Sequence, residues 1–252
     1  MELYYLPVSP WSERMLFGLQ VAGVKVALVE YTPFVSEPYL RWKMGRFNWN
    51  EQVTVPVLLL GNGQGYVEGS LPILKHLTNG KLLWPKDQDK LARITALVDV
   101  VLKNGRYRYS VKTSQTGGRL DVDMLSFPLN KVLPWLPQAV ETFLVKTFAS
   151  KFLVKYDADR ASDAFQDAFD EMHKALTELE DMIQDKPYVC DNTLTVADII
   201  LSSAMPFVAL PGEFNNIGPQ MLAQMQDPEL ENAFPRLVKW RNELYAQHRR
   251  LH

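Results

Sequence analysis

Hydrophobic and polar positions divide the chain into two regions with different periodicities. In the first eighty or so residues, short apolar runs with strand character alternate with segments whose apolar residues recur at helical spacing. A strand, a helix and a second strand in succession predict a parallel pair, whereas the Gly-rich turn at 61–65 predicts a hairpin. The predicted order is βαβαββα, with strands at 2–6, 24–30, 55–60 and a short run ending at Val67, and helices at 11–21, 37–44 and 70–77.

Beyond residue 85 the pattern changes to long amphipathic helices. Apolar residues share one face over 90–103 and over 165–183, and a last apolar stripe begins at Pro235. Thr195 and Asp198 have the spacing of a capping box, which predicts the start of a buried helix. We therefore predict an α+β protein, with one domain over 1–83 and an all-helical domain over 88–252.

The region between the two long helices has a mixed pattern. Residues 110–119 are polar and include two adjacent glycines, which predicts a loop, whereas 131–154 is apolar with helix character after Pro137. The aromatic residues of the insertion at 106–159 fit either extra core or a roof over an apolar binding site.

Composition and charge narrow the classes of function. The 252 residues are 47% hydrophobic and 22% charged, as in an ordinary soluble globular protein. The net charge of −2 creates no field that would gather nucleic acid, so we expect no nucleic-acid partner. The most apolar stretch, 132–154, is interrupted by prolines and charged residues, so we expect no membrane span.

Cysteine and histidine usage adds two expectations. Cys190 is the single cysteine and has no partner for an internal disulfide, and the first residues lack the basic region and apolar run of a signal peptide. We therefore expect a cytoplasmic protein. The four histidines are scattered without metal-ligand spacing, so we expect no metal.

The junction between the first strand and the first helix is the first candidate site. Ligands of open αβ units bind at the carboxyl ends of strands, near helix amino termini. Pro10 suits a first helical turn, which places Ser9 at the N-cap, close to free backbone amides and the positive end of the helix dipole. Ser9 is therefore either an anion-binding residue or a plain cap.

Motifs in both regions resemble one enzyme family. The segment Ser9-Pro-Trp-Ser12 stands where thioredoxin-like proteins carry Cys-x-x-Cys, and Val55-Pro56 precedes the third strand. The runs at 192–199 and 234–240 are similar to the capping box and closing helix of a helical domain. Together they resemble the glutathione S-transferases (GSTs) over nearly the whole chain, and Ser-Pro-aromatic-x-x-Arg is most similar to the serine-type tau and omega-like classes.

The resemblance implies a thioredoxin-like domain that binds glutathione and a helical domain that contributes an apolar acceptor site. It implies a detoxifying transferase that conjugates glutathione to apolar electrophiles, as a homodimer, with glutathione as co-substrate and no metal. By the same resemblance, Ser9 is the catalytic residue that faces the sulfur, and a cis Pro56 presents the backbone of Val55 to the peptide. Ser70, which we expect to be the N-cap of the helix at 70–77, receives the γ-glutamyl carboxylate by the resemblance, with Glu68 close by.

The chemistry expected of Ser9 is modest in energy. Lowering a thiol pKa from ~8.5 by about two units requires about 2.7 kcal/mol of preference for the thiolate. A charge-assisted hydrogen bond supplies roughly 1.5–3 kcal/mol, and the helix amino terminus adds a few tenths to one more. Since positions 9 and 12 are both serine, thiol–disulfide exchange is not expected.

Two departures from the family pattern leave an alternative open. Gly69 occupies the position expected to be acidic, with Glu68 one residue earlier, and Thr54 occupies a position that is often basic. The alternative is therefore a non-catalytic GST-like binder of hydrophobic ligands, or a scaffold. The candidates to replace the missing cation are Arg14, Arg41, Lys43 and Arg46.

Two aromatic residues near Ser9 complete the candidates. Tyr5 is a rival sulfur ligand to Ser9, because other classes of the family use a tyrosine near the first strand, although a tyrosine within a strand is more often a packing residue. Trp11 fits either the lining of the substrate pocket or an anchor for the first helix.

Overall fold

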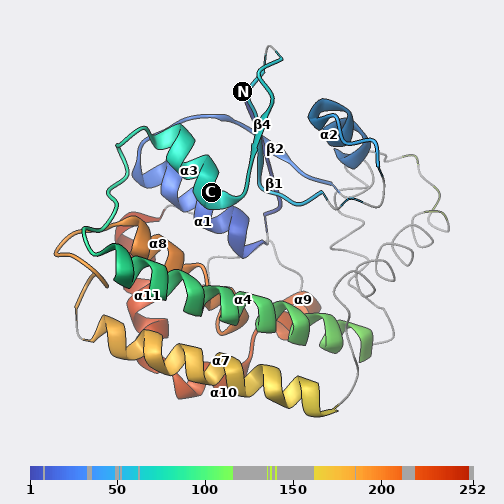
Figure 1. Ribbon diagram of the computed structural model, residues 1–252. Coiled ribbons are helices and arrows are strands. Elements are labelled where there is room, and N and C mark those ends of the chain that lie inside the picture. The colour runs from blue at the N-terminus through green and yellow to red at the C-terminus, as the bar shows by residue number, and fades with distance from the viewer. Residues whose placement is uncertain are drawn as a thin grey trace.

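The computed structural model describes residues 1–115, 162–211 and 219–249, apart from 8, 33–35, 49–50, 52, 62 and 185, together with 135, 137 and 140. Its amino-terminal part has the predicted order of elements, and we call it the sheet unit (Figure 1). The elements are β1 (Glu2–Tyr5), α1 (Pro10–Val21), β2 (Ala27–Glu30), α2 (Ser36–Met44), β3 (Val57–Leu59), β4 (Tyr66–Glu68) and α3 (Ser70–Thr78).

The four strands form one mixed sheet in the order β2-β1-β3-β4. The β1 and β2 strands are parallel, and β3 runs antiparallel to both β1 and β4, with Val57 opposite Tyr4 on one side and Glu68 on the other. The carboxyl ends of β1 and β4 therefore lie at the same edge of the sheet as the start of β3. This edge, which we call the site edge, is where α1 and α3 begin.

Strand alternation assigns the two faces of the sheet to different neighbours. Leu3 and Leu58 face the core that contains α1 and α3, whereas Tyr4 and Val57 join a second cluster with Leu40 of α2. The sheet is thus covered by α2 on one face and by α1 and α3 on the other, and both apolar faces are buried.

The remaining elements form what we call the helical unit, which lies against α1 and α3 (Figure 1). The long helices α4 and α7 pack side by side, and Asn104 of α4 donates a 2.7 Å hydrogen bond to Glu171 of α7. The elements are α4 (Gln88–Gln115), α7 (Ser162–Ile183), α8 (Val196–Ser202), the 3₁₀ turn η1 (Met205–Phe207), α9 (Pro219–Met225), α10 (Pro228–Ala233) and α11 (Pro235–His248).

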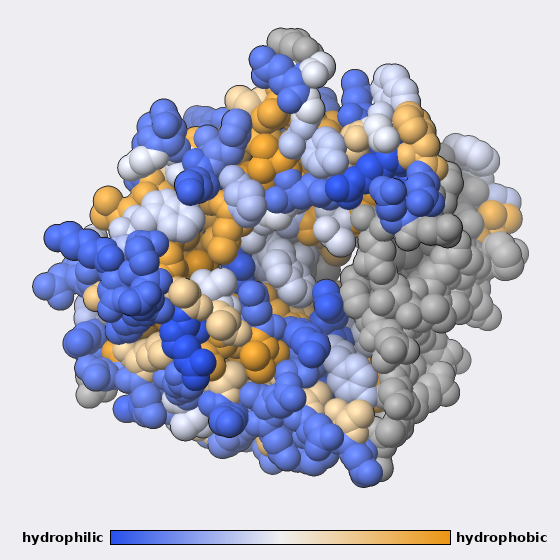
Figure 2. All heavy atoms as spheres, in the orientation of Figure 1, coloured by the Kyte–Doolittle hydropathy of each residue, from blue (hydrophilic) through white to orange (hydrophobic). Residues whose placement is uncertain are grey.

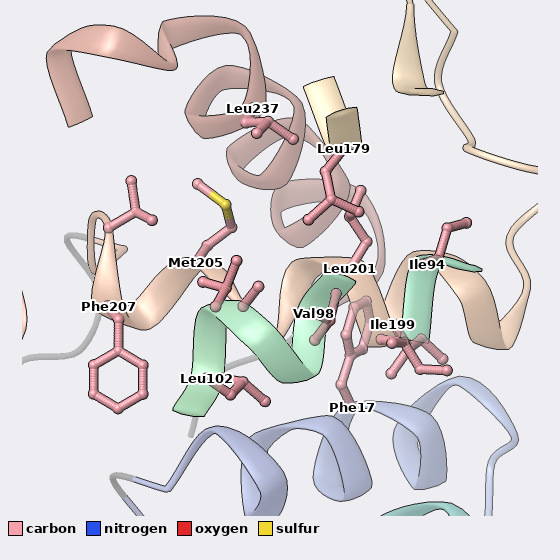
Figure 3. Close-up of a cluster of buried hydrophobic side chains, with 14 of the residues drawn as sticks. Phe17, Ile94, Val98, Leu102, Leu179, Ile199, Leu201, Met205, Phe207 and Leu237 are labelled. Atoms are coloured by element: carbon pink, nitrogen blue, oxygen red, sulfur yellow. The ribbon is translucent and has the colours of Figure 1, made fainter. Parts of the chain in front are cut away.

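One hydrophobic core joins the two units. Phe17 projects from α1 toward Val98 of α4 and Ile199 of α8, so the first helix completes the core of the helical unit (Figure 3). Gly105 lets α4 approach η1, because a Cβ there would lie 2.5 Å from the ring of Phe207.

On the surface, polar side chains cover most of the face in Figure 2, and hydrophobic ones gather at the strands and between the helices.

The structure confirms one local prediction in the helical unit and corrects another. Thr195 accepts from the amide of Ala197, and Asp198 accepts from the amide of Thr195, which completes the capping box. However, α4 continues to Gln115 through residues expected to form a loop, because Val111 and Thr113 are buried by packing in the helical unit and this packing outweighs their low helix preference. Most of the 106–159 insertion lies outside the described residues.

Candidate functional site

Ser9 lies at the N-cap of α1, as the sequence predicted. Its backbone is extended, its side chain is partly exposed, and its hydroxyl makes no capping bond. The loop before the helix is held by other groups, since the Ser9 amide donates to the Leu6 carbonyl at 3.0 Å and the Leu6 amide donates to the buried Ser12 hydroxyl at 3.1 Å. The Ser9 hydroxyl is therefore not needed to cap its own helix.

Val55 and Pro56 lie at the site edge, immediately before β3. The Val55–Pro56 peptide bond is cis, as the resemblance implied. The Pro56 carbonyl accepts a 3.1 Å hydrogen bond from the amide of Gly69, which ties this segment to the start of α3. Within the described part of the chain, neither backbone group of Val55 has a hydrogen-bond partner, so both remain for an extended peptide.

Ser70 begins α3 at the same edge, in a position slightly different from the predicted one. Gly69 is the N-cap, with φ of 86°, and Ser70 is the first helical residue. A residue without Cβ adopts this conformation readily, so the glycine takes the cap position and turns Ser70 into the helix. The Ser70 side chain is buried, and its hydroxyl makes no hydrogen bond to the described residues.

Glu68 is engaged by a cation that is distant in sequence. The two Nη groups of Arg46 donate to its two carboxylate oxygens at 2.9 Å and 2.6 Å, and the Arg46 guanidinium lies over the ring of Tyr66. The hydrogen bonds to this carboxylate raise the pKa of Arg46 above its ordinary value, although burial acts to lower it. Glu68 therefore has its own charge partner, and Arg46 is held in the sheet unit beside the site edge.

The other cations proposed for the glycine carboxylate have different roles. Arg14 is buried and donates to the Ser203 hydroxyl at 3.0 Å. Arg41 is buried and binds Glu37, and the Lys43 ammonium lies 4.8 Å from the centre of the Trp42 ring. Thr54 is exposed at the surface.

The two aromatic candidates lie on either side of Ser9 in the chain. Tyr5 ends β1, its carbonyl accepts from the amide of Tyr31 at 2.7 Å, and burial together with the charge of Glu30 raises the pKa of its hydroxyl. Trp11 is partly exposed in the first turn of α1, and the guanidinium of Arg106 from α4 lies 5.4 Å from its ring centre. Trp11 thus meets the helical unit through a cation–π contact.

The arrangement suits a ligand with a peptide backbone and anionic groups. Two helix amino termini and the hydroxyls of Ser9 and Ser70 lie at one edge of a sheet, and Figure 2 shows this face hollowed between the sheet unit and the helical unit.

Burial raises the pKa of the Cys190 thiol to about 11, which makes it a poor nucleophile. Within the described ranges, no group of three His, Cys, Asp or Glu side chains could hold a metal, and no helix is long and apolar enough to cross a bilayer.

Two contacts at the site were not predicted from the sequence. The pairing of Arg46 with Glu68 joins residues 22 positions apart, and the contact of Arg106 with Trp11 joins the two units. Neither has a local sequence signal, because each depends on how separate elements pack.

Models of protein families match both units. The model described as the glutathione S-transferase N-terminal domain matches residues 3–80, and the one described as the glutathione S-transferase C-terminal domain matches residues 162–243. Together these matches cover more than half of the chain, and they correspond to the sheet unit and to most of the helical unit. A comparison with curated proteins gave no match.

Solved structures share the fold at low sequence identity. A glutathione S-transferase from Methylobacterium radiotolerans, in complex with glutathione sulfonate, has a TM-score of 0.61 and 17% identity, covering 98% of this chain and 90% of that one. A β-etherase from Sphingobium has a TM-score of 0.59 and 19% identity, covering 97% and 94%. A glutathione S-transferase from Methylobacillus flagellatus with glutathione bound has a TM-score of 0.56 and 14% identity, covering 97% and 94%. The thioredoxin-like sheet unit followed by a helical unit is the fold that the sequence predicted.

Proposed function

Because this chain belongs to the glutathione S-transferase family, we propose that it binds glutathione at the site edge and conjugates its sulfur to an apolar electrophile. The observation that carries the proposal is the convergence of Ser9, Val55 and Ser70 on one edge of the sheet, each with an uncommitted polar group among the described residues. We assign the chain to the serine-type enzymes of this family, similar to the tau and omega-like classes.

The Ser9 hydroxyl is proposed to donate a hydrogen bond to the glutathione sulfur. This bond favours the thiolate over the thiol by roughly 1.5–3 kcal/mol, and the amino terminus of α1 adds a smaller contribution. Ser9 removes no proton, since its task is to lower the thiol pKa so that solvent accepts the proton near neutral pH. The thiolate then attacks the electrophile, and a C–S bond forms as the leaving group departs or the double bond accepts the electron pair.

The rest of the tripeptide is proposed to lie along the site edge. The two backbone groups of Val55 pair with the cysteinyl part as a short antiparallel strand would, and Ser70 with the free amides of α3 receives the γ-glutamyl carboxylate. Glu68 is close in the chain to Ser70, but it forms an ion pair with Arg46, so its charge is neutralised.

The test compares Ser9→Ala with Thr177→Ala, which removes an exposed hydroxyl from α7 far from the site edge. The thiolate of bound glutathione is titrated by its ultraviolet absorbance, and conjugation to 1-chloro-2,4-dinitrobenzene is measured in parallel. We expect S9A to raise the thiol pKa and to lower kcat/KM by about 10- to 100-fold, as the loss of one charge-assisted bond implies. T177A should match the wild type, and an unchanged thiol pKa in S9A would remove Ser9 from the mechanism. Tyr5→Phe tests the rival donor in the same assays.

A second function is favoured by the charge pattern at the site edge. Gly69 replaces an acidic residue, Thr54 is exposed where a base is often found, and Arg46 is bound to Glu68. These observations fit a GST-like protein that binds hydrophobic ligands or acts as a scaffold without catalysis. Calorimetric titration with glutathione separates the two functions, because the enzyme should bind it with a micromolar to low millimolar Kd and the binder should not.

Dimer formation, a role in detoxification and a cytoplasmic location stay predictions. Light scattering tests the first of them.

A further inference from the structure

The end of α11 contacts one face of α1 at three successive levels. Residues 13, 17 and 20 of α1 lie on this face, at helical spacing. Arg249 binds Glu13 at the first level, and the Tyr245 ring meets the Phe17 ring edge-on at the second, with 5.3 Å between centroids. At the third level, Arg249 Nη1 donates to Gln20 Oε1 at 2.7 Å. One segment of the helical unit therefore supports α1 along most of its length.

The pairing of Arg249 with Glu13 is buried and two-pronged. Arg249 Nε donates to one carboxylate oxygen at 2.7 Å and Nη2 donates to the other at 3.0 Å. The side chains are only 8% and 4% exposed. Burial lowers the pKa of Arg249, but the hydrogen-bonded carboxylate of Glu13 outweighs this and leaves that pKa raised. Burial, and next the charge of Glu13, raise the pKa of the Tyr245 hydroxyl well above its ordinary value.

Glu13 is directly connected to Ser9 through the backbone. The Glu13 amide donates to the Ser9 carbonyl at 2.9 Å, which is the first hydrogen bond of α1. If Arg249 were absent, the buried carboxylate of Glu13 would lose the two charge-assisted hydrogen bonds of the guanidinium, and it would gain free energy by moving toward water. Such a movement would displace the first turn of α1 together with Ser9.

We propose that Arg249 is a positioning residue for Ser9, and that it acts through Glu13 to fix the first turn of α1 at the site edge. The inference rests on the proposed function, in which the hydroxyl of Ser9 donates to the glutathione sulfur. Displacing a donor by as little as an ångström costs up to about 100-fold in rate. Arg249, the C-cap residue of α11 in the helical unit, thus sets the geometry of the chemistry proposed for the sheet unit.

The experiment compares Arg249→Gln with Arg93→Gln. Arg93 also binds a glutamate, Glu178, through two bonds, but this pair is exposed and joins α4 to α7. Three quantities are measured: amide hydrogen exchange in α1 without ligand, the thiol pKa of bound glutathione, and kcat/KM. For R249Q we expect faster exchange over the first turns of α1, a higher thiol pKa and a kcat/KM lower by about tenfold. R93Q should match the wild type in all three.

The outcomes separate this inference from the proposed function. If R249Q melts at a lower temperature but keeps the wild-type thiol pKa and kcat/KM, Arg249 is merely structural and the inference is wrong. Unchanged hydrogen exchange in α1 would also overturn it. If the wild type binds no glutathione, the proposed function fails, whereas hydrogen exchange still reports whether Arg249 fixes the first turn. Should R249Q fail to fold, Arg249→Lys replaces it in the test. Lysine keeps the positive charge but lacks the planar guanidinium that binds both carboxylate oxygens, so we expect about a threefold loss in kcat/KM.

Discussion

The carboxylate of Asp198 is the side chain whose removal should destabilise the helical unit most clearly. Asp198 is fully buried at the start of α8, and its two oxygens accept three hydrogen bonds. One oxygen accepts from the amide of Val189 at 2.7 Å, and the other accepts from the amide and the hydroxyl of Thr195 at 2.8 Å and 3.0 Å. Burial raises the pKa of Asp198, and these donors offset part of that effect.

Two substitutions of Asp198 should differ by a calculable amount. Asp198→Asn keeps the shape of the side chain and one acceptor oxygen. The orientation with most hydrogen bonds has this oxygen facing the two Thr195 donors. Only the Val189 amide then loses its partner. One unpaired buried amide costs about 1–3 kcal/mol. Asp198→Ala leaves the amides of both Val189 and Thr195 unpaired, which should cost about 2–6 kcal/mol. The alanine variant is therefore expected to be the less stable by at least about 1 kcal/mol.

Urea unfolding at neutral pH, followed by far-ultraviolet circular dichroism, measures both costs. The matched control is Asp170→Asn, because Asp170 is exposed on α7 and accepts one bond from Gln166. That change should alter the free energy of unfolding by less than about 0.5 kcal/mol. If D198N proved as stable as D170N, or D198A no worse than D198N, the count of unpaired donors would be the wrong explanation. The result also bears on α1, since Ser203 at the end of α8 accepts the bond from Arg14.

Two further predictions concern the packing and charge of α4. Gly105→Ala should destabilise the protein by about 1–3 kcal/mol, because the added Cβ would lie 2.5 Å from the Phe207 ring, and a thermal melt showing no loss would contradict this close approach. Burial acts to raise the pKa of Asp227, but the bond from Arg108 and the charges of Lys112 and Arg108 together outweigh it, and the pKa is lowered. A carboxylate with a lowered folded-state pKa stabilises the protein above its ordinary pKa and loses this contribution as the pH falls through the lowered value. Urea unfolding between about pH 6 and pH 3 should therefore show a steeper loss of stability for the wild type than for Asp227→Asn, and parallel curves would contradict this.

The sequence predicted features that depend on neighbouring residues. The order of elements in the sheet unit followed from apolar runs and glycine turns, and the capping box of Thr195 and Asp198 followed from their spacing. The N-cap of α3 was assigned to Ser70 instead of Gly69, since capping preferences favour serine and the positive φ at residue 69 depends on the tie to Pro56.

Contacts between distant residues could not be predicted in the same way. Arg46 was one of four candidate cations, and nothing local distinguished it as the partner of Glu68. The pairing of Glu13 with Arg249 depends on where α11 ends relative to α1, which is a property of the packed core. The convergence of the site residues followed from topology, whereas the contacts that support them did not.

The contact of Glu13 with Arg249 also has a consequence for folding during synthesis on the ribosome. It joins residues 236 positions apart, and ribosomes add about 5–20 residues per second, so α1 waits roughly 10–50 s for its last partner. Phe17 and Leu3 share a core with α4, α8 and α11, so the sheet unit emerges with an apolar face that has nothing yet to cover it. During synthesis this face would be available to chaperones, and the sheet unit would gain its full stability only when the end of α11 has left the ribosome.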